Sequence, residues 1–173
     1  MALDVDATSI EGVWFRHVPA GGDPLFRPQH PVDGRWHRGL VEGFYVADEE
    51  ATAWAEWYRA LAEAGIPPMR QLPRDLWRFN VEVDHVADLS SPERLERVGL
   101  PRPVPDRRQW PSFQTVGDSM LAEGWVGILY PAAARLGSLA LCLFGADEFP
   151  GVRPLPPPTR YEEPPVPPRG LRA

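Results

Sequence analysis

The sequence predicts a single α+β domain with a mixed β-sheet. Short stretches rich in aromatic and β-branched residues recur along the chain, which predicts strands, and one longer segment carries apolar residues at helical spacing. The two kinds of element follow one another irregularly, whereas a regular alternation would predict a parallel sheet. With 173 residues, of which 43% are hydrophobic, the chain suits one domain with one core.

The first two predicted strands cover residues 13–18 and 43–47. Residues 19–34 between them are rich in proline and glycine, which predicts a loop. Asp48 is a suitable N-cap for the helix that follows, because its side chain can accept a hydrogen bond from the first turn. The apolar stripe of this helix consists of Ala51, Trp54, Ala55, Tyr58, Leu61 and Ala62.

In the second half of the chain, the sequence predicts shorter helices and strands. In order, these are a half-buried strand at residues 79–83, a short helix from Ser91 to near Gly99, a loop at 101–108, a helix at 112–122, and apolar strands at 126–130 and 139–144. Residues 150–173 contain nine prolines, which exclude a helix or a central strand. We therefore expect a domain over residues 1–149 and a proline-rich tail over 150–173, solvated or lying along the surface; a polyproline ligand for another domain is the alternative.

Composition excludes several functions. The formal net charge of −6 argues against non-specific binding to nucleic acid, which depends on basic residues. All 18 basic residues are arginines, so Schiff-base and P-loop lysine chemistry are excluded. The acidic N-terminus lacks an apolar signal core and no run suits a membrane span, so the expected location is the cytoplasm. The single cysteine, Cys142, lies in an apolar strand and is expected to be a core residue.

Common catalytic motifs are absent from the sequence. It contains no glycine-rich phosphate loop, no nucleophile elbow and no histidines at metal-ligand spacing, so no metal site is expected. Arg16 in the first strand, Arg35 before the second strand and Glu56 in the helix remain as candidates. Each has a structural alternative: an outward strand residue, an arginine packed on a tryptophan, and a solvated glutamate paired with Arg59.

Several short stretches in a fixed order resemble the RES domain family over residues 12–144. They are Trp14-Phe15-Arg16, Gly34-Arg35-Trp36, Tyr45-Val46-Ala47-Asp48, Ala55-Glu56, Val83-Asp84, Glu96–Leu100, Gln114–Asp118 and Gly127–Pro131. The resemblance implies a fold like that of ADP-ribosyltransferases and an activity that consumes NAD⁺. It also implies that the chain is the toxin of a bacterial type II toxin–antitoxin system, whose active site is occluded by an Xre-type helix-turn-helix antitoxin.

The resemblance also implies site residues. The family's two arginines fall on Arg16 and Arg35, its tyrosine on Tyr45 and its glutamate on Glu56, while the nearest match to its serine is Ser112. These residue types suit cleavage of the nicotinamide–ribose bond, which builds positive charge on the ribose while nicotinamide departs neutral. The arginines are expected to hold the pyrophosphate and the glutamate to stabilise the cation. The tyrosine is expected to stack on nicotinamide, and the serine to bond its amide or the ribose.

The expected catalytic group is therefore Glu56, Arg35 and Ser112, and the expected substrate-binding group is Arg16, Arg35 and Tyr45. NAD⁺ is the substrate and no prosthetic group is expected, with water or inorganic phosphate as the acceptor. Two other functions stay open: transfer of ADP-ribose to a protein, and a non-catalytic binding module. The oligomeric state also stays open, a homo-oligomer included.

Overall fold

A computed structural model describes residues 3–25, 32–39, 42–145 and 149–172. The elements are β1 (Asp6–Pro19), β2 (Glu42–Ala47), α1 (Glu50–Ala64), the 3₁₀ turn η1 (Pro68–Gln71), β3 (Arg74–Asp88), α2 (Pro92–Arg97), the 3₁₀ turn η2 (Arg107–Gln109), α3 (Trp110–Ala122), β4 (Gly127–Pro131), β5 (Leu139–Gly145) and β6 (Val152–Tyr161). The predicted α+β fold with a mixed sheet is confirmed. Each predicted strand and helix is present, and β1 and β3 extend well beyond the predicted ranges.

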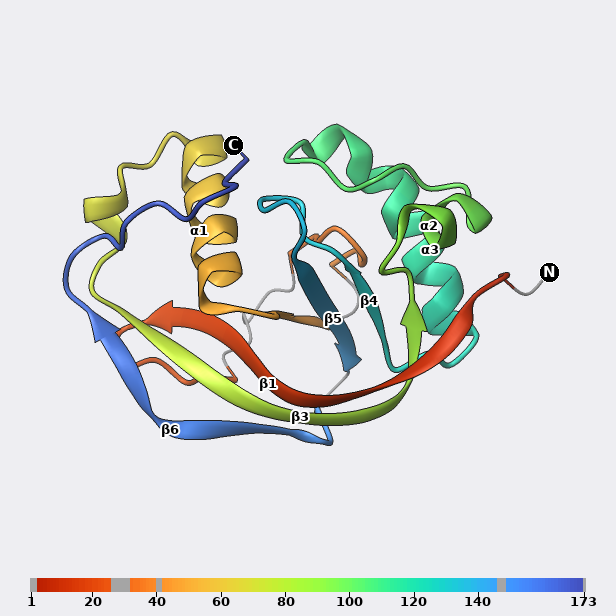
Figure 1. Cartoon of the computed structure of the whole chain (residues 1–173), viewed down its shortest axis with the longest axis horizontal. Coiled ribbons are helices and arrows are strands. Elements are labelled where there is room, and N and C mark those ends of the chain that lie inside the picture. Colours follow the sequence, from red (N-terminus) through yellow and green to blue (C-terminus); the bar gives the residue numbers. More distant parts are fainter. Residues whose placement is uncertain (1–2, 26–31, 40–41, 146–148, 173) are drawn as a thin grey trace.

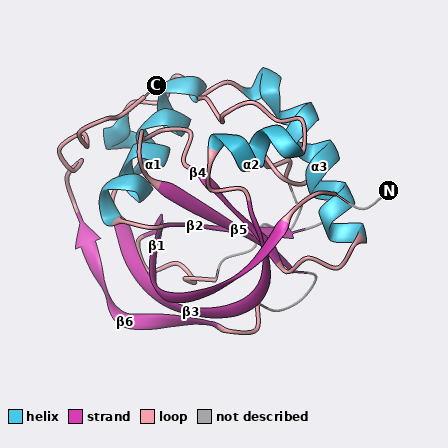
Figure 2. Ribbon diagram, turned by 45° about the vertical axis from the view of Figure 1, so that its right-hand side comes forward, coloured by secondary structure: helices cyan, strands magenta, loops and turns pink. Residues whose placement is uncertain are grey.

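The sheet is six-stranded with the order β1-β2-β5-β4-β3-β6, and β1 pairs with β3 as well as with β2. β3 and β4 run parallel, and the other pairs among the described strands are antiparallel. The long strands β1, β3 and β6 form a curved layer, and α1, α2 and α3 all lie on the same side of it (Figure 2). α1 and the α2–α3 pair flank β4 and β5 from opposite sides (Figure 1).

Alternation along β3 explains its position in the core. Phe79 and Val81 are fully buried, while Glu82 and Asp84 between the apolar positions are exposed. This is the period of a strand with one face on the core. The buried face joins a cluster with residues of β1, β2 and β5, and a second cluster gathers under α3 around Trp36 and Phe113. Apolar burial on both sides of the central strands thus holds the helices in place.

Helix α1 differs from the prediction in two respects. Its N-cap is Glu49, not Asp48, because the Asp48 carboxylate accepts a hydrogen bond from the Leu139 backbone N–H at 2.7 Å and so joins the end of β2 to β5. The buried face also differs from the predicted stripe: Thr52, Ala53 and Trp57 are buried, whereas Ala62 is exposed. The helix ends at Gly65, which adopts the left-handed conformation as a C-cap.

The segment predicted as a tail begins with a strand. β6 lies at the edge of the sheet, antiparallel to β3. Prolines are compatible with an edge because their missing N–H groups can face outward. After β6 the chain crosses α1 and ends near the turn between β4 and β5 (Figure 1). In the described ranges, no helix combines the length and the apolar sequence needed to span a membrane.

Gly117 allows α3 to lie directly against the segment that carries Arg35. A Cβ atom at this position would lie 1.9 Å from the backbone oxygen of Trp36. Gly117→Ala is therefore expected to lower the free energy of unfolding by about 2 kcal/mol, because the clash with backbone outweighs the roughly 1 kcal/mol of helix propensity that alanine adds. Urea denaturation measures this change. Ser112→Ala, at an exposed position on the same helix, is the control, and equal stability of the two variants would contradict the prediction.

Candidate functional site

A cavity of about 370 Å³ lies among β1, β2, α1, β4 and the start of α3. Its volume is within the usual range for small-molecule sites. The lining consists of Phe15, Arg16, His17, Gly34, Arg35, Tyr45, Val46, Ala47, Ala53, Glu56, Arg59, Trp110, Tyr130 and Ala140. The fold therefore brings together four of the five predicted site residues, which lie far apart in the sequence: Arg16, Arg35, Tyr45 and Glu56.

Arg35 is a buried cation with one nitrogen unused. Its side chain is held over the Phe113 ring, and its Nη2 donates to the Val104 backbone oxygen at 2.8 Å. The residue is only 7% exposed, and Nη1 is buried without a hydrogen-bond partner among the described residues. Burial lowers the pKa of Arg35, and nearby Tyr130 and Glu56 oppose this effect. A buried donor without a partner is unfavourable, so this nitrogen is suited to a ligand oxygen that enters the cavity.

Arg16 reaches the cavity from the middle of β1, so the alternative of an outward strand residue does not apply. Its guanidinium lies over the Phe44 ring at 4.7 Å, and Nη1 donates to the Pro24 backbone oxygen at 3.2 Å. Burial lowers the pKa of Arg16 to about 10, and the Asp23 carboxylate opposes this shift. The side chain therefore carries its charge at neutral pH and adds a second cation to the cavity.

Glu56 projects from α1 into the same cavity, and both of its carboxylate oxygens accept hydrogen bonds. Oε1 accepts from the Ala134 backbone N–H at 3.1 Å, and Oε2 accepts from Arg59 Nε at 2.9 Å. Glu56 thus pairs with Arg59, as the structural alternative expected, and also lines the cavity. Two bonds from different directions fix the orientation of the carboxylate, as a preorganised site requires.

Charged contacts continue from Arg59 toward the start of α3. Arg59 Nη1 also pairs with Glu63 at 3.0 Å, and Glu63 pairs with Arg107 Nε at 2.8 Å. Arg107 in turn lies over the ring of Trp110. These contacts connect α1 with η2 and α3 beside the cavity.

Two tyrosines line the cavity. The Tyr45 hydroxyl accepts a hydrogen bond from the Trp36 backbone N–H at 3.2 Å, which holds the residue next to Arg35 in place. Burial raises the pKa values of Tyr45 and of Tyr130, so both hydroxyls stay protonated at neutral pH. Gly34 faces the Tyr45 hydroxyl so closely that a Cβ would lie 2.4 Å from it. The glycine at this position therefore allows the segment that carries Arg35 to lie close against Tyr45 of β2.

His17, next to Arg16 on β1, is neutral. Its ring stacks on Trp54 at 5.2 Å, and Nδ1 accepts from Arg74 Nε at 3.0 Å. Burial, together with the Arg74 and Arg16 cations, lowers its pKa to about 3. Because Nδ1 is an acceptor, the ring proton is on Nε2, and His17 adds a neutral ring to the cavity lining.

Ser112 does not line the cavity. It is exposed on α3, whereas Trp110, two residues earlier and about 200° around the helix, does line it. The sequence prediction also missed His17, Arg59 and Tyr130 as cavity residues. Signals for them were present, since His17 adjoins Arg16, Arg59 lies one helical turn after Glu56, and Tyr130 lies in the last of the matching stretches.

Other groups have structural roles. Cys142 is fully buried, as predicted, and burial raises the pKa of its thiol to about 12. The part of the chain that the structure describes holds no cluster of three or more histidine, cysteine, aspartate or glutamate side chains arranged for a metal ion.

The chain is similar to known proteins both in fold and in sequence family. The chain is similar to one in the crystal structure of the M. tuberculosis MbcT–MbcA toxin–antitoxin complex, with a TM-score of 0.71 and 21% sequence identity over 90% of this chain and 86% of that chain. This likeness shows that the two chains share an α+β fold. No curated protein matches the sequence. The model of the RES domain matches residues 12–163, which is most of the chain and includes every residue that lines the cavity, so the chain belongs to the RES domain family.

Proposed function

We propose that this protein cleaves NAD⁺ at the nicotinamide–ribose bond and is the toxin of a bacterial toxin–antitoxin pair. The observation that carries the proposal is that two groups line one cavity: Arg35, whose buried Nη1 has no hydrogen-bond partner among the described residues, and the Glu56 carboxylate, which two hydrogen bonds hold in place. A dinucleotide carries anionic phosphates and, during cleavage, a cationic ribose. The cavity offers a buried cation for the first and an oriented anion for the second.

Each side chain has a role in this reaction. The Arg35 and Arg16 guanidinium groups bind phosphate oxygens, and Arg35 adds to catalysis by fixing the dinucleotide against the carboxylate. Glu56 stabilises the positive charge that develops on the ribose as the bond to nicotinamide breaks. Nicotinamide leaves as a neutral ring, so the site needs no general acid. The ring of Tyr45 supplies an aromatic surface for it.

Family membership and the likeness to a toxin–antitoxin complex support an antitoxin as partner. We expect an Xre-type helix-turn-helix protein that covers the mouth of the cavity and blocks NAD⁺. In this scheme the antitoxin carries any contact with DNA, the toxin acts in the cytoplasm, and NAD⁺ is its substrate.

The direct test incubates the purified protein with NAD⁺, without antitoxin, and follows nicotinamide release by chromatography. Parallel reactions with and without inorganic phosphate separate the products ADP-ribose and ADP-ribose 1″-phosphate, and so identify the acceptor. NAD⁺ labelled in the adenosine half shows whether label becomes attached to protein, which would favour ADP-ribose transfer. If no reaction releases nicotinamide but the protein still binds its antitoxin, the chain is a non-catalytic binding module.

Ser112→Ala is expected to leave nicotinamide release within about twofold of the wild type. Its side chain is exposed on α3 and outside the cavity, and surface substitutions of this kind have small effects. Steady-state kinetics with NAD⁺ measure this. A tenfold loss of kcat in a Ser112→Ala variant of unchanged stability would show that Ser112 takes part in the reaction.

A further inference from the structure

The C-terminal segment after β6 returns to the turn that holds Glu56. It passes over α1, where the Tyr58 hydroxyl donates to the Pro165 backbone oxygen, and ends beside the turn between β4 and β5 (Figure 1). There the Arg172 backbone N–H donates to the Ala134 oxygen at 2.7 Å, and Leu171 forms a β-bridge with Arg135. We call residues 164–172 the C-terminal strap.

Ala134 connects this strap to the candidate active site. Its carbonyl oxygen accepts from Arg172, and its N–H donates to Glu56 Oε1 at 3.1 Å. The same residue is therefore bonded to the strap through its oxygen and to the carboxylate through its nitrogen. A displacement of the turn removes one of the two hydrogen bonds that orient Glu56.

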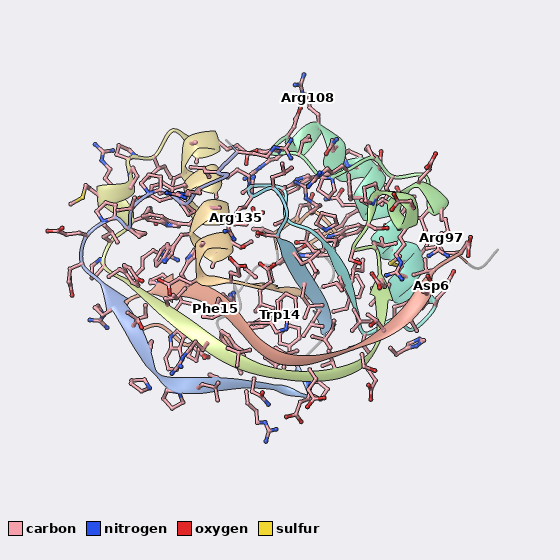
Figure 3. All side chains as sticks on the ribbon, in the orientation of Figure 1. Asp6, Trp14, Phe15, Arg97, Arg108 and Arg135 are labelled. Carbon is pink, nitrogen blue, oxygen red and sulfur yellow. The ribbon has the colours of Figure 1, made fainter. Side chains whose placement is uncertain are left out.

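Arg135 fixes the turn from a second direction. Its Nη1 contacts three oxygens: Glu49 Oε2 at 2.5 Å and Thr52 Oγ1 at 3.1 Å at the start of α1, and Ser138 Oγ at 2.9 Å in the turn itself. Its Nε donates to the Arg169 backbone oxygen of the strap at 3.2 Å. Figure 3 shows Arg135 beside α1, the helix that carries Glu56. One guanidinium thus joins the turn, the helix and the strap.

We propose that the C-terminal strap and Arg135 position the Ala134 N–H, and through it the Glu56 carboxylate, for cleavage of NAD⁺. Arg135 is a positioning residue, since it lies outside the cavity lining and acts through Ala134. This inference rests on the proposed function. Errors in the position of a catalytic group of about 1 Å reduce rates by about 100-fold, so a loosened turn lowers kcat more than it weakens NAD⁺ binding.

The experiment compares the full chain with three variants: a chain ending at Glu163, the full chain with Arg135→Met, and the control Val166→Ser. Arg135→Met keeps the stem of the side chain but removes its donors. Val166 belongs to the strap but is 88% exposed, so its substitution leaves the strap contacts in place. Thermal unfolding verifies that each variant is folded. If the shortened chain does not fold, the Arg135→Met variant of the full chain tests the proposal.

Two measurements are made on each variant. Steady-state kinetics are expected to show kcat reduced by about 30- to 100-fold in the shortened chain and in Arg135→Met, with KM for NAD⁺ changed by less than about threefold. Amide hydrogen exchange is expected to be faster across residues 132–138, with wild-type exchange in β4 and β5. Val166→Ser is expected to behave as the wild type in both. The proposal is overturned if kcat/KM falls only because KM rises, or if kcat stays within twofold of the wild type.

Hydrogen exchange also separates this inference from the proposed function, because it needs no NAD⁺. If the wild type releases no nicotinamide but the variants lose protection at residues 132–138, only the proposed reaction fails. If the wild type is active and protection of the turn is the same in all variants, the strap has no positioning role.

Discussion

Glu56→Gln is expected to lower kcat for nicotinamide release by about 1,000-fold and to change KM for NAD⁺ by less than about fivefold. Glutamine keeps the shape of the side chain and an oxygen that can accept from the Ala134 N–H. It lacks the negative charge that stabilises the ribose cation, and loss of one such electrostatic contribution typically reduces kcat by about 10²- to 10³-fold. The loss falls mainly on kcat because the cation exists only near the transition state.

Glu63→Gln is the matched control for this prediction. Glu63 lies on the same helix and also pairs with Arg59, but it is not among the residues that line the cavity. We expect kcat to change by less than about threefold, as for a surface ion pair. Initial rates over a range of NAD⁺ concentrations measure both variants. Equal losses in the two, or a Glu56→Gln variant within tenfold of the wild type, would show that this carboxylate does not act on the reaction.

Arg35→Lys is expected to lower kcat/KM for NAD⁺ by about 100-fold, chiefly by raising KM. Arg35 lines the cavity; its Nη2 is bonded to the Val104 oxygen, and its buried Nη1 has no hydrogen-bond partner among the described residues. The single ammonium of lysine keeps the charge but cannot occupy both positions, and it lacks the planar group that lies over the Phe113 ring. A charge-assisted hydrogen bond to a phosphate oxygen contributes about 3 kcal/mol to binding, and its loss accounts for the expected decrease in kcat/KM.

Arg38→Lys provides the comparison, because Arg38 lies close in sequence but is exposed and pairs with Asp118 on the surface. Its kcat/KM is expected to remain within about twofold of the wild type. Calorimetric titration with ADP-ribose tests binding without turnover, and the Arg35→Lys variant is expected to bind it about 100-fold more weakly. If the Arg35→Lys variant bound ADP-ribose with wild-type affinity, Arg35 would not be the residue that binds the phosphates.

Helices α1 and α3 lie where the sequence predicts them but differ from the prediction at individual residues. Periodicity predicted both helices because the apolar side of a helix repeats every 3.6 residues. It did not distinguish Asp48 from Glu49 as the N-cap of α1, since Asp48 is used by Leu139 on another strand. On α3, Ser112 was the nearest match to the family's serine, but the helix turns Trp110, not Ser112, toward the cavity.

The site residues divide in the same way. Arg16, Arg35, Tyr45 and Glu56 could be predicted because they lie within short stretches whose order resembles a known family. Tyr130 also lies in such a stretch, and Arg59 lies one turn after Glu56, but only the packing of β4 and α1 shows that both side chains line the cavity. The prolines of residues 150–173 predicted a surface position for this segment. Its pairing with β3 as strand β6 depends on the register of a strand more than 70 residues earlier in the chain.

The sequence by itself determined the fold class and the approximate places of α1 to α3 and of β1 to β5, because these follow from local periodicity, but it missed β6. Only the tertiary structure decided which groups meet. The bond from Ala134 to Glu56 joins residues 78 positions apart, and the return of Arg172 to Ala134 requires the strap to cross α1 first. Such contacts depend on how strands pair and helices pack over the whole chain, which no local pattern encodes.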